Sequence, residues 1–285
     1  MMNKQKFKEE LELIIDNAIR EDIGEGDHSS LACIPENALG KAQLLVKDDG
    51  ILAGVEFAGM VFHRIDPQLK LDIFIPDGNY VRYGDIAFTV EGKSRSILMA
   101  ERIVLNAIQR MSAIATKTNR YVKILQDTNT KILDTRKTTP GIRALEKWAV
   151  KIGGGTNHRF GLYDMIMLKD NHIDFAGGIR QAIIKTRDYL KKNNLDLKIE
   201  IETRNLDEVQ EVLETGGVDR IMLDNFNYED LRKAVEMIGG KYETEASGGI
   251  TEKTLLKYAE CGVDYISSGA LTHSVANMDF SLKAV

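Results

Sequence analysis

The spacing of apolar residues changes part-way along the chain. In the first ninety residues, helical spacing over "FKEELELIIDNAI" (7–19) and "VEFAGMVFHRI" (55–65) predicts two helices. The stretch "KAQLLVKDDGILAG" (41–54) predicts two strands joined by an Asp-Gly turn, and 69–75 and 86–92 predict two more. This mixture is typical of a small α+β domain.

From Ser94 a segment free of glycine and proline predicts one long helix, to about Leu125. Beyond it, short apolar strands alternate with helical patterns, which favours parallel strands joined by right-handed crossovers. "MIML" (165–168) is apolar enough to predict a fully buried strand. The predicted strands are Lys131–Leu133, Asp164–Leu168, Leu197–Glu202, Arg220–Leu223, Glu243–Ala246 and Tyr265–Ser267.

The fold class is therefore α/β. We expect an N-terminal α/β sandwich domain over 1–110 and an α/β barrel of about six to seven strands over 111–274. The tail, about 275–285, is expected to pack with the first domain.

Composition narrows the classes of protein that this chain can represent. Its apolar fraction of 43% and charged fraction of 28% are those of an ordinary globular protein. The net charge of -5 argues against a general binder of nucleic acid or membrane surfaces. Cys33 and Cys261 are isolated, and neither a membrane-length apolar run nor a signal-like start is present, so we expect a cytoplasmic protein.

Basic residues gather where the predicted strands end, which is the working face of an α/β barrel. Arg136 and Lys137 follow the first strand, His158 and Arg159 precede the second, and Lys169 follows it. A single such residue is more often a solvated surface charge. Five of them on one face predict a pocket for a small anion, because like charges repel unless an anion lies among them.

Carboxylates and glycine loops follow the later strands. Glu200 and Glu202 share one face of their strand, and Asp224 ends the next. Glu202 and Asp224 suit Mg²⁺ or sugar hydroxyls, whereas Glu200 is equally suited to an ion pair with a neighbouring cation. The loops at 247–249 ("SGG") and 267–273 ("SSGALTH") suit phosphate at helix starts, or serve only as tight turns. Together these features suggest transfer at a phosphorylated sugar carbon, or an aldolase-like reaction.

The central stretch "ILDTRKTTPGIRALEKWAVKIGGGTNHRFGLYDMIMLKDNHI" resembles the signature region of the quinolinate phosphoribosyltransferase family. "EDIGEGDHSS", "AERIVLNAIQRMSAIAT", "IMLDNF", "EASGGI" and "ISSGALTHS" match the family's other segments in order. The resemblance implies conversion of quinolinate and phosphoribosyl pyrophosphate into nicotinate mononucleotide, pyrophosphate and carbon dioxide, with Mg²⁺, in NAD biosynthesis. It also implies a sandwich domain, an α/β barrel and at least a homodimer.

Site residues follow from the resemblance, position by position. The implied quinolinate pocket is made by Thr135, Arg136, Lys137, His158, Arg159 and Lys169, with Arg102 reaching in from a partner subunit. Glu202 and Asp224 are implied to hold the ribose hydroxyls and the metal, and either Lys137 or Lys169 to assist decarboxylation. The implied phosphate side comprises Ser247, Gly248, Gly249, Gly269, Ala270, Leu271 and His273.

Two departures and three alternatives accompany this interpretation. One extra residue in "ETGGVDRIMLDN" leaves Glu200 open as a substitute for Glu202, and Arg204 stands where the family commonly has an acidic residue. The alternatives are a molybdenum-transport-associated paralogue, a nicotinate phosphoribosyltransferase and a non-catalytic phosphosugar-binding protein. The complete cationic set speaks against the first two, and the paired carboxylates speak against the third.

Overall fold

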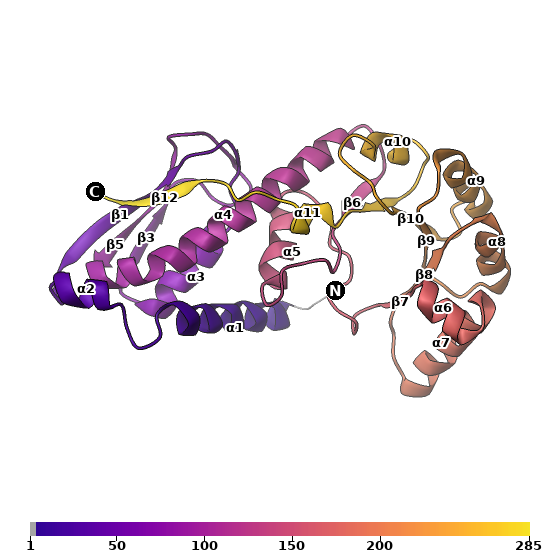
Figure 1. Ribbon diagram of the computed structural model, residues 1–285, viewed down its shortest axis with the longest axis horizontal. Coiled ribbons are helices and arrows are strands. Elements are labelled where there is room, and N and C mark those ends of the chain that lie inside the picture. Colours follow the sequence, from indigo (N-terminus) through magenta and orange to yellow (C-terminus); the bar gives the residue numbers. More distant parts are fainter. Residues whose placement is uncertain (1–3) are drawn as a thin grey trace. The chain divides into compact units, whose positions relative to one another are not determined.

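The computed structural model describes residues 4–285, which form two compact units (Figure 1). One unit comprises residues 120–137 and 155–270, and the other comprises residues 4–119, 138–154 and 271–285. The chain therefore passes between the units four times. The domain boundary at residue 110 stays a prediction; helix α4 (Ser94–Ile124) runs through it without a break.

An antiparallel sheet with the order β12-β1-β5-β3 organises the unit that contains the N-terminal segment. The tail strand β12 pairs with β1 from Ala42↔Ala284 to Val46↔Phe280. The two strands predicted around the Asp-Gly turn are present as β1 and β2, but they do not pair with each other. Strands β12 and β5 occupy both edges of β1, and β2 pairs with β4. The strands are β1 (Leu39–Val46), β2 (Gly50–Ile51), β3 (Lys70–Ile73), β4 (Tyr80–Val81), β5 (Ile86–Lys93) and β12 (Phe280–Ala284).

Helices of this unit bury the apolar stripes that the sequence predicts. In the first helix, Leu11, Ile14 and Ile15 are buried, as their spacing requires. Phe7 meets Trp148 edge to face, with ring centroids 5.5 Å apart. The helices are α1 (Lys4–Asp22), α2 (His28–Cys33), α3 (Val55–Ile65), α4, α5 (Arg143–Ile152) and α11 (Ala270–His273), the last of which begins in the other unit at Ala270.

The other unit is built on a six-stranded parallel sheet with the order β6-β11-β10-β9-β8-β7. The first strand, β6, pairs with the last strand, β11, as in a barrel. On its other side β6 meets Thr156 through an isolated bridge from Leu133. The strands are β6 (Lys131–Leu133), β7 (Ile166–Leu168), β8 (Ile199–Thr203), β9 (Arg220–Asp224), β10 (Glu243–Ser247) and β11 (Tyr265–Ser267).

Helices flank this curved sheet along its outer side (Figure 1). They are α6 (Asp170–Ala176), α7 (Ile179–Asn193), α8 (Leu206–Thr215), α9 (Tyr228–Ile238) and α10 (Leu255–Ala259). The predicted α/β class and smaller N-terminal sheet are confirmed. Within residues 4–285, no helix is long and apolar enough to cross a membrane.

Strand β7 differs from its prediction in burial. Only Leu168 is buried, whereas Ile166 and Met167 are half-buried. The reason is position, since β7 ends the row of paired strands and has a neighbour, β8, on one side only. The cations around it therefore flank an edge strand.

Candidate active site

Two guanidinium groups form the cationic side of the site. Arg159 is buried, and its Nη1 donates to the Met165 carbonyl at 3.1 Å. Burial and the charge of Arg136 lower the pKa of Arg159, which places the two cations near each other. The Nε of Arg136 is buried and has no hydrogen-bond partner within residues 4–285. A buried guanidinium N–H without an acceptor is costly, so this arrangement suits an anionic ligand.

Asp134 fixes the loop that carries these cations, and the sequence analysis missed it. Its carboxylate is fully buried and accepts from the His158 backbone N–H at 2.9 Å and from Asn157 Nδ2 at 2.5 Å. Asp134 thereby joins the end of β6 to the segment before Arg159. Beyond it, Thr135 Oγ1 accepts from the Lys137 N–H at 3.0 Å and turns the chain.

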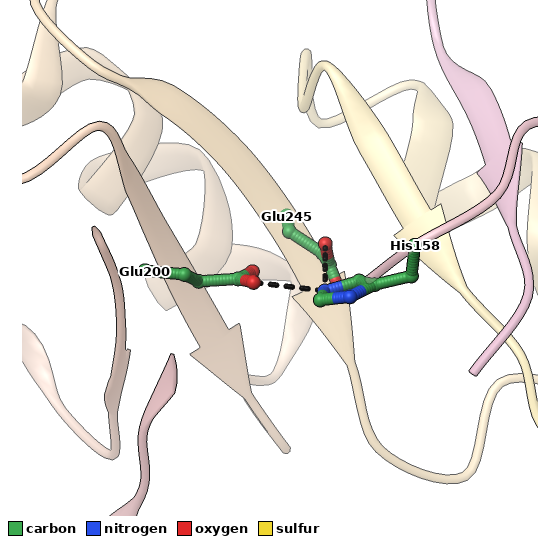
Figure 2. Close-up of side chains that lie close together, drawn as sticks. All are labelled: His158, Glu200 and Glu245. Atoms are coloured by element: carbon green, nitrogen blue, oxygen red, sulfur yellow. Dashed lines mark ion pairs between the residues drawn. The ribbon is translucent and has the colours of Figure 1, made fainter. Parts of the chain in front are cut away.

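His158 points toward buried carboxylates (Figure 2). Its Nε2 lies 2.8 Å from Glu200 and 3.5 Å from Glu245, and its side chain is only 6% exposed. Burial disfavours the imidazolium, but the two carboxylates outweigh burial and raise the pKa of His158 to about 9. This nitrogen is therefore already engaged by two carboxylates, while direct contact of His158 with quinolinate stays a prediction.

Glu200 and Glu245 form the interior half of this network. Burial and the charge of Glu245 raise the pKa of Glu200 to about 7, although His158 and Arg220 oppose the shift. Burial also acts on Glu245, but His158, Ser267 and Arg220 hold its pKa below the usual value. Arg220 Nη1 lies 3.0 Å from Glu245. Glu200 therefore forms an ion pair with His158, which is one of the roles that the sequence analysis allowed for it.

His158, Glu200 and Glu245 could in principle hold a metal ion, since their ligand atoms lie within 4.8 Å of one another. The Arg220 guanidinium next to Glu245 already supplies positive charge there. We therefore interpret this group as an ion-pair network.

Glu202 faces a different environment from Glu200. It is half-buried, and burial together with the charges of Asp224 and Asp170 raises its pKa, while Lys169 opposes the shift. Glu202 and Asp224 thus lie close enough to repel, at the carboxyl ends of adjacent strands. Paired oxygen ligands of this kind fit a hard cation such as Mg²⁺.

The two glycine loops differ in their local geometry. Gly248 has a φ of +99°, and a side chain there would collide with Asn225, so the turn itself requires glycine. The helix after "SGG" begins only at Leu255, so the expected helix start is wrong for this loop. The second loop does lead directly from Gly269 into α11.

The remaining predicted residues lie on or next to helices. Lys169 is exposed at the start of α6, where its N–H donates to His172 Nδ1 at 3.0 Å. Arg102 is exposed on α4. In α11, Leu271 is buried and His273 is exposed.

Models of two protein domains match consecutive parts of the chain. Residues 27–112 match the quinolinate phosphoribosyl transferase N-terminal domain, and residues 114–283 match the C-terminal domain. The chain belongs to the quinolinate phosphoribosyltransferase family.

Relatives of this family span most of the chain. It is 48% identical to nicotinate-nucleotide pyrophosphorylase [carboxylating], chloroplastic, of Oryza sativa subsp. japonica, over 96% of this chain and 77% of that protein. It is 41% identical to the probable nicotinate-nucleotide pyrophosphorylase [carboxylating] of Bacillus subtilis, over 96% and 93% respectively. The crystal structure of NadC from Streptococcus pyogenes superposes with a TM-score of 0.90 at 38% identity, covering 99% of this chain and 97% of that one.

Arg204, the departure from the quinolinate phosphoribosyltransferase pattern, is compensated locally. Its guanidinium pairs with Asp174 at 3.2 Å and with Glu208 at 2.7 Å. The added positive charge is therefore offset by two carboxylates on α6 and α8. For the other departure, the extra residue before β9, the structure shows that Glu202 lies beside Asp224, and the role of Glu202 stays a prediction.

Proposed function

We propose that this chain transfers the phosphoribosyl group of phosphoribosyl pyrophosphate to quinolinate, with loss of carbon dioxide, in NAD biosynthesis. The products are nicotinate mononucleotide, pyrophosphate and carbon dioxide. The observation that carries the proposal is the buried Arg136 Nε, which has no acceptor among the described residues 4–285 and is near Arg159. Two adjacent cations suit the two adjacent carboxylates of quinolinate, and guanidinium groups bind carboxylates in forked geometry.

Glu202 and Asp224 are proposed to serve the sugar. Their carboxylates would stabilise the positive charge that grows on the anomeric carbon as pyrophosphate leaves and the ring nitrogen attacks. The same pair would hold Mg²⁺, which offsets charge on the leaving pyrophosphate when bound. Like-charge repulsion at Glu202 supports this role, because a cation there would relieve it.

Lys137 or Lys169 is proposed to assist decarboxylation. Once the ring nitrogen of quinolinate carries the sugar, the quaternised ring can stabilise the carbanion formed as the 2-carboxylate departs as carbon dioxide, and a proton from solvent then replaces the lost carboxylate. A nearby ammonium group then needs only to hold the substrate in place. Both lysine side chains are exposed to solvent and are therefore accessible to substrate.

The test is an assay of the purified chain with quinolinate, phosphoribosyl pyrophosphate and Mg²⁺, with nicotinate mononucleotide and carbon dioxide followed together. We expect both products from quinolinate and neither from nicotinate. Arg136→Met should abolish turnover, whereas Arg180→Met, which alters an exposed arginine paired with Glu214 at 3.9 Å, should leave it unchanged. A folded chain that makes neither product would refute the proposal and favour a binding protein.

We further propose a homodimer in which Arg102 completes the partner's pocket. In support, Arg102 is exposed and makes no ion pair within residues 4–285. If Arg102→Ala and Lys169→Met are each inactive, an equal mixture should regain about a quarter of native activity, because half of the dimers carry one intact site. No recovery after subunit exchange, confirmed by differently tagged chains, would contradict this arrangement.

A reducing compartment such as the cytoplasm remains our proposal for the location. The supporting observation is that Cys33 and Cys261 are both free thiols.

A further inference from the structure

A buried ion pair lies away from the residues assigned above. Arg110 on α4 donates from Nε at 3.0 Å and from Nη2 at 2.7 Å to Glu146 Oε1, near the start of α5. Glu146 is fully buried, whereas the Arg110 side chain is 20% exposed. Such a pair is expensive to desolvate and therefore calls for good geometry and further hydrogen bonds.

Both Glu146 oxygens also bind the loop that follows Lys137. The Thr139 N–H donates to Oε2 at 3.0 Å, and the Thr139 hydroxyl donates to Oε1 at 2.8 Å. Thr139 is two residues after Lys137, just beyond a point where the chain passes between the units. Glu146 therefore fixes one end of the loop that carries Arg136 and Lys137.

Arg110 reaches a second candidate substrate segment. Its Nη2 donates to the Thr272 carbonyl, and its Nη1 donates to the Val275 carbonyl at 3.5 Å. Thr272 lies in α11 between Leu271 and His273, and it follows another passage of the chain between the units. The Arg110–Glu146 pair thus bonds to Thr139 and Thr272, which are close in sequence to residues of the implied quinolinate and phosphate subsites respectively.

We propose that the Arg110–Glu146 pair is a positioning device for both substrates: Glu146 sets the loop for the dicarboxylate, and Arg110 sets α11 for the sugar phosphate. This inference rests on the proposed function. Neither residue needs to touch substrate, because each acts through backbone or hydroxyl groups of Thr139 and Thr272.

Steady-state kinetics of the full chain, with each substrate varied at saturation of the other, test the assignment. Thr139→Val removes one hydrogen bond to a charged group and should raise the KM for quinolinate about 10-fold. Arg110→Lys keeps the charge but loses the fork that reaches Thr272, and it should raise the KM for phosphoribosyl pyrophosphate by a similar factor. Glu146→Gln should raise both.

Thr130→Val is the matched control. The buried Thr130 hydroxyl donates to the Val263 carbonyl at 2.6 Å, and Thr130 precedes β6, at the opposite end of that strand from the loop that carries Arg136 and Lys137. It should lower the melting temperature without changing either KM. If Glu146→Gln does not fold, the opposite substrate selectivity of Thr139→Val and Arg110→Lys decides the question.

Unchanged KM values in Thr139→Val and Arg110→Lys would overturn the inference, even if both variants are less stable. An equal rise in both KM values for all variants, the control included, would overturn it too, because it would indicate general loosening. An inactive native chain would instead refute the proposed function. The two failures are therefore distinguishable.

Discussion

Replacing Glu200 with Gln should change the charge state of His158. The imidazole has an ordinary pKa of 6.5, and its two carboxylate neighbours raise this to about 9. A neighbouring carboxylate shifts a pKa by roughly one to three units. We therefore expect Glu200→Gln to lower the pKa of His158 by at least about one unit. With Glu245→Gln added, burial alone remains, and the pKa should fall below 6.5.

The same shift sets a pH dependence of stability. A group whose pKa is raised on folding contributes stability that is complete below its unfolded pKa and is lost as pH rises through its folded pKa. For His158 that window runs from 6.5 to about 9. At 1.36 kcal/mol per unit, the free energy of unfolding should decrease by about 3 kcal/mol across it. Glu200, whose pKa is raised to about 7, acts in the same direction at lower pH.

NMR titration of histidine-labelled protein from pH 5.5 to 10 measures the pKa directly. The chain has five histidines, and His158→Gln identifies the resonance. Urea unfolding at both ends of the window measures stability, and His158→Gln should lose about 3 kcal/mol less than the native chain between them. A native His158 pKa at or below 6.5, or one that Glu200→Gln leaves unchanged, would refute the reasoning.

Four further substitutions test the site. Lys137→Met and Lys169→Met should cut kcat far more than they lower the melting temperature; full activity in either variant would remove that lysine from decarboxylation. Glu202→Gln should raise the KM for phosphoribosyl pyrophosphate about 10-fold or more and weaken the dependence on Mg²⁺, as measured by titration with the metal. Asp134→Asn should lower the free energy of unfolding by about 2–4 kcal/mol in urea denaturation, because the buried amide loses charge-assisted hydrogen bonds to Asn157 and the His158 backbone.

Much of the parallel sheet could be predicted from local pattern. The strands at 131–133 and 265–267 have the bounds that their apolar runs indicate. The pairing of the antiparallel sheet could not be predicted in the same way. Strand β12 is five residues long, and its partner β1 lies more than 200 residues earlier, so no local signal in the sequence indicates that these two strands pair.

The site shows a similar limit. Asp134 in "KILD" and Asp224 in "IMLD" follow apolar strands in the same way, yet they differ in surroundings. Asp134 is buried by hydrogen bonds to residues 23 and 24 positions later, whereas Asp224 stays half-buried beside Glu202. The sequence identifies a carboxylate at a strand end. Only the tertiary contacts decide whether it supports a loop or faces a ligand.

Glu200 and Glu202 lie on the same strand, β8, but have different surroundings. Both point to the same face, but Glu202 lies one step nearer the carboxyl end, beside Asp224, and Glu200 lies one step deeper, against His158. The charge of Glu200 also opposes the effects of burial and of Arg136 on Arg159. Negative charge on Glu200 therefore offsets part of the repulsion that Arg159 feels from Arg136. The interior network is thus part of what makes two neighbouring cations tolerable at the end of this sheet.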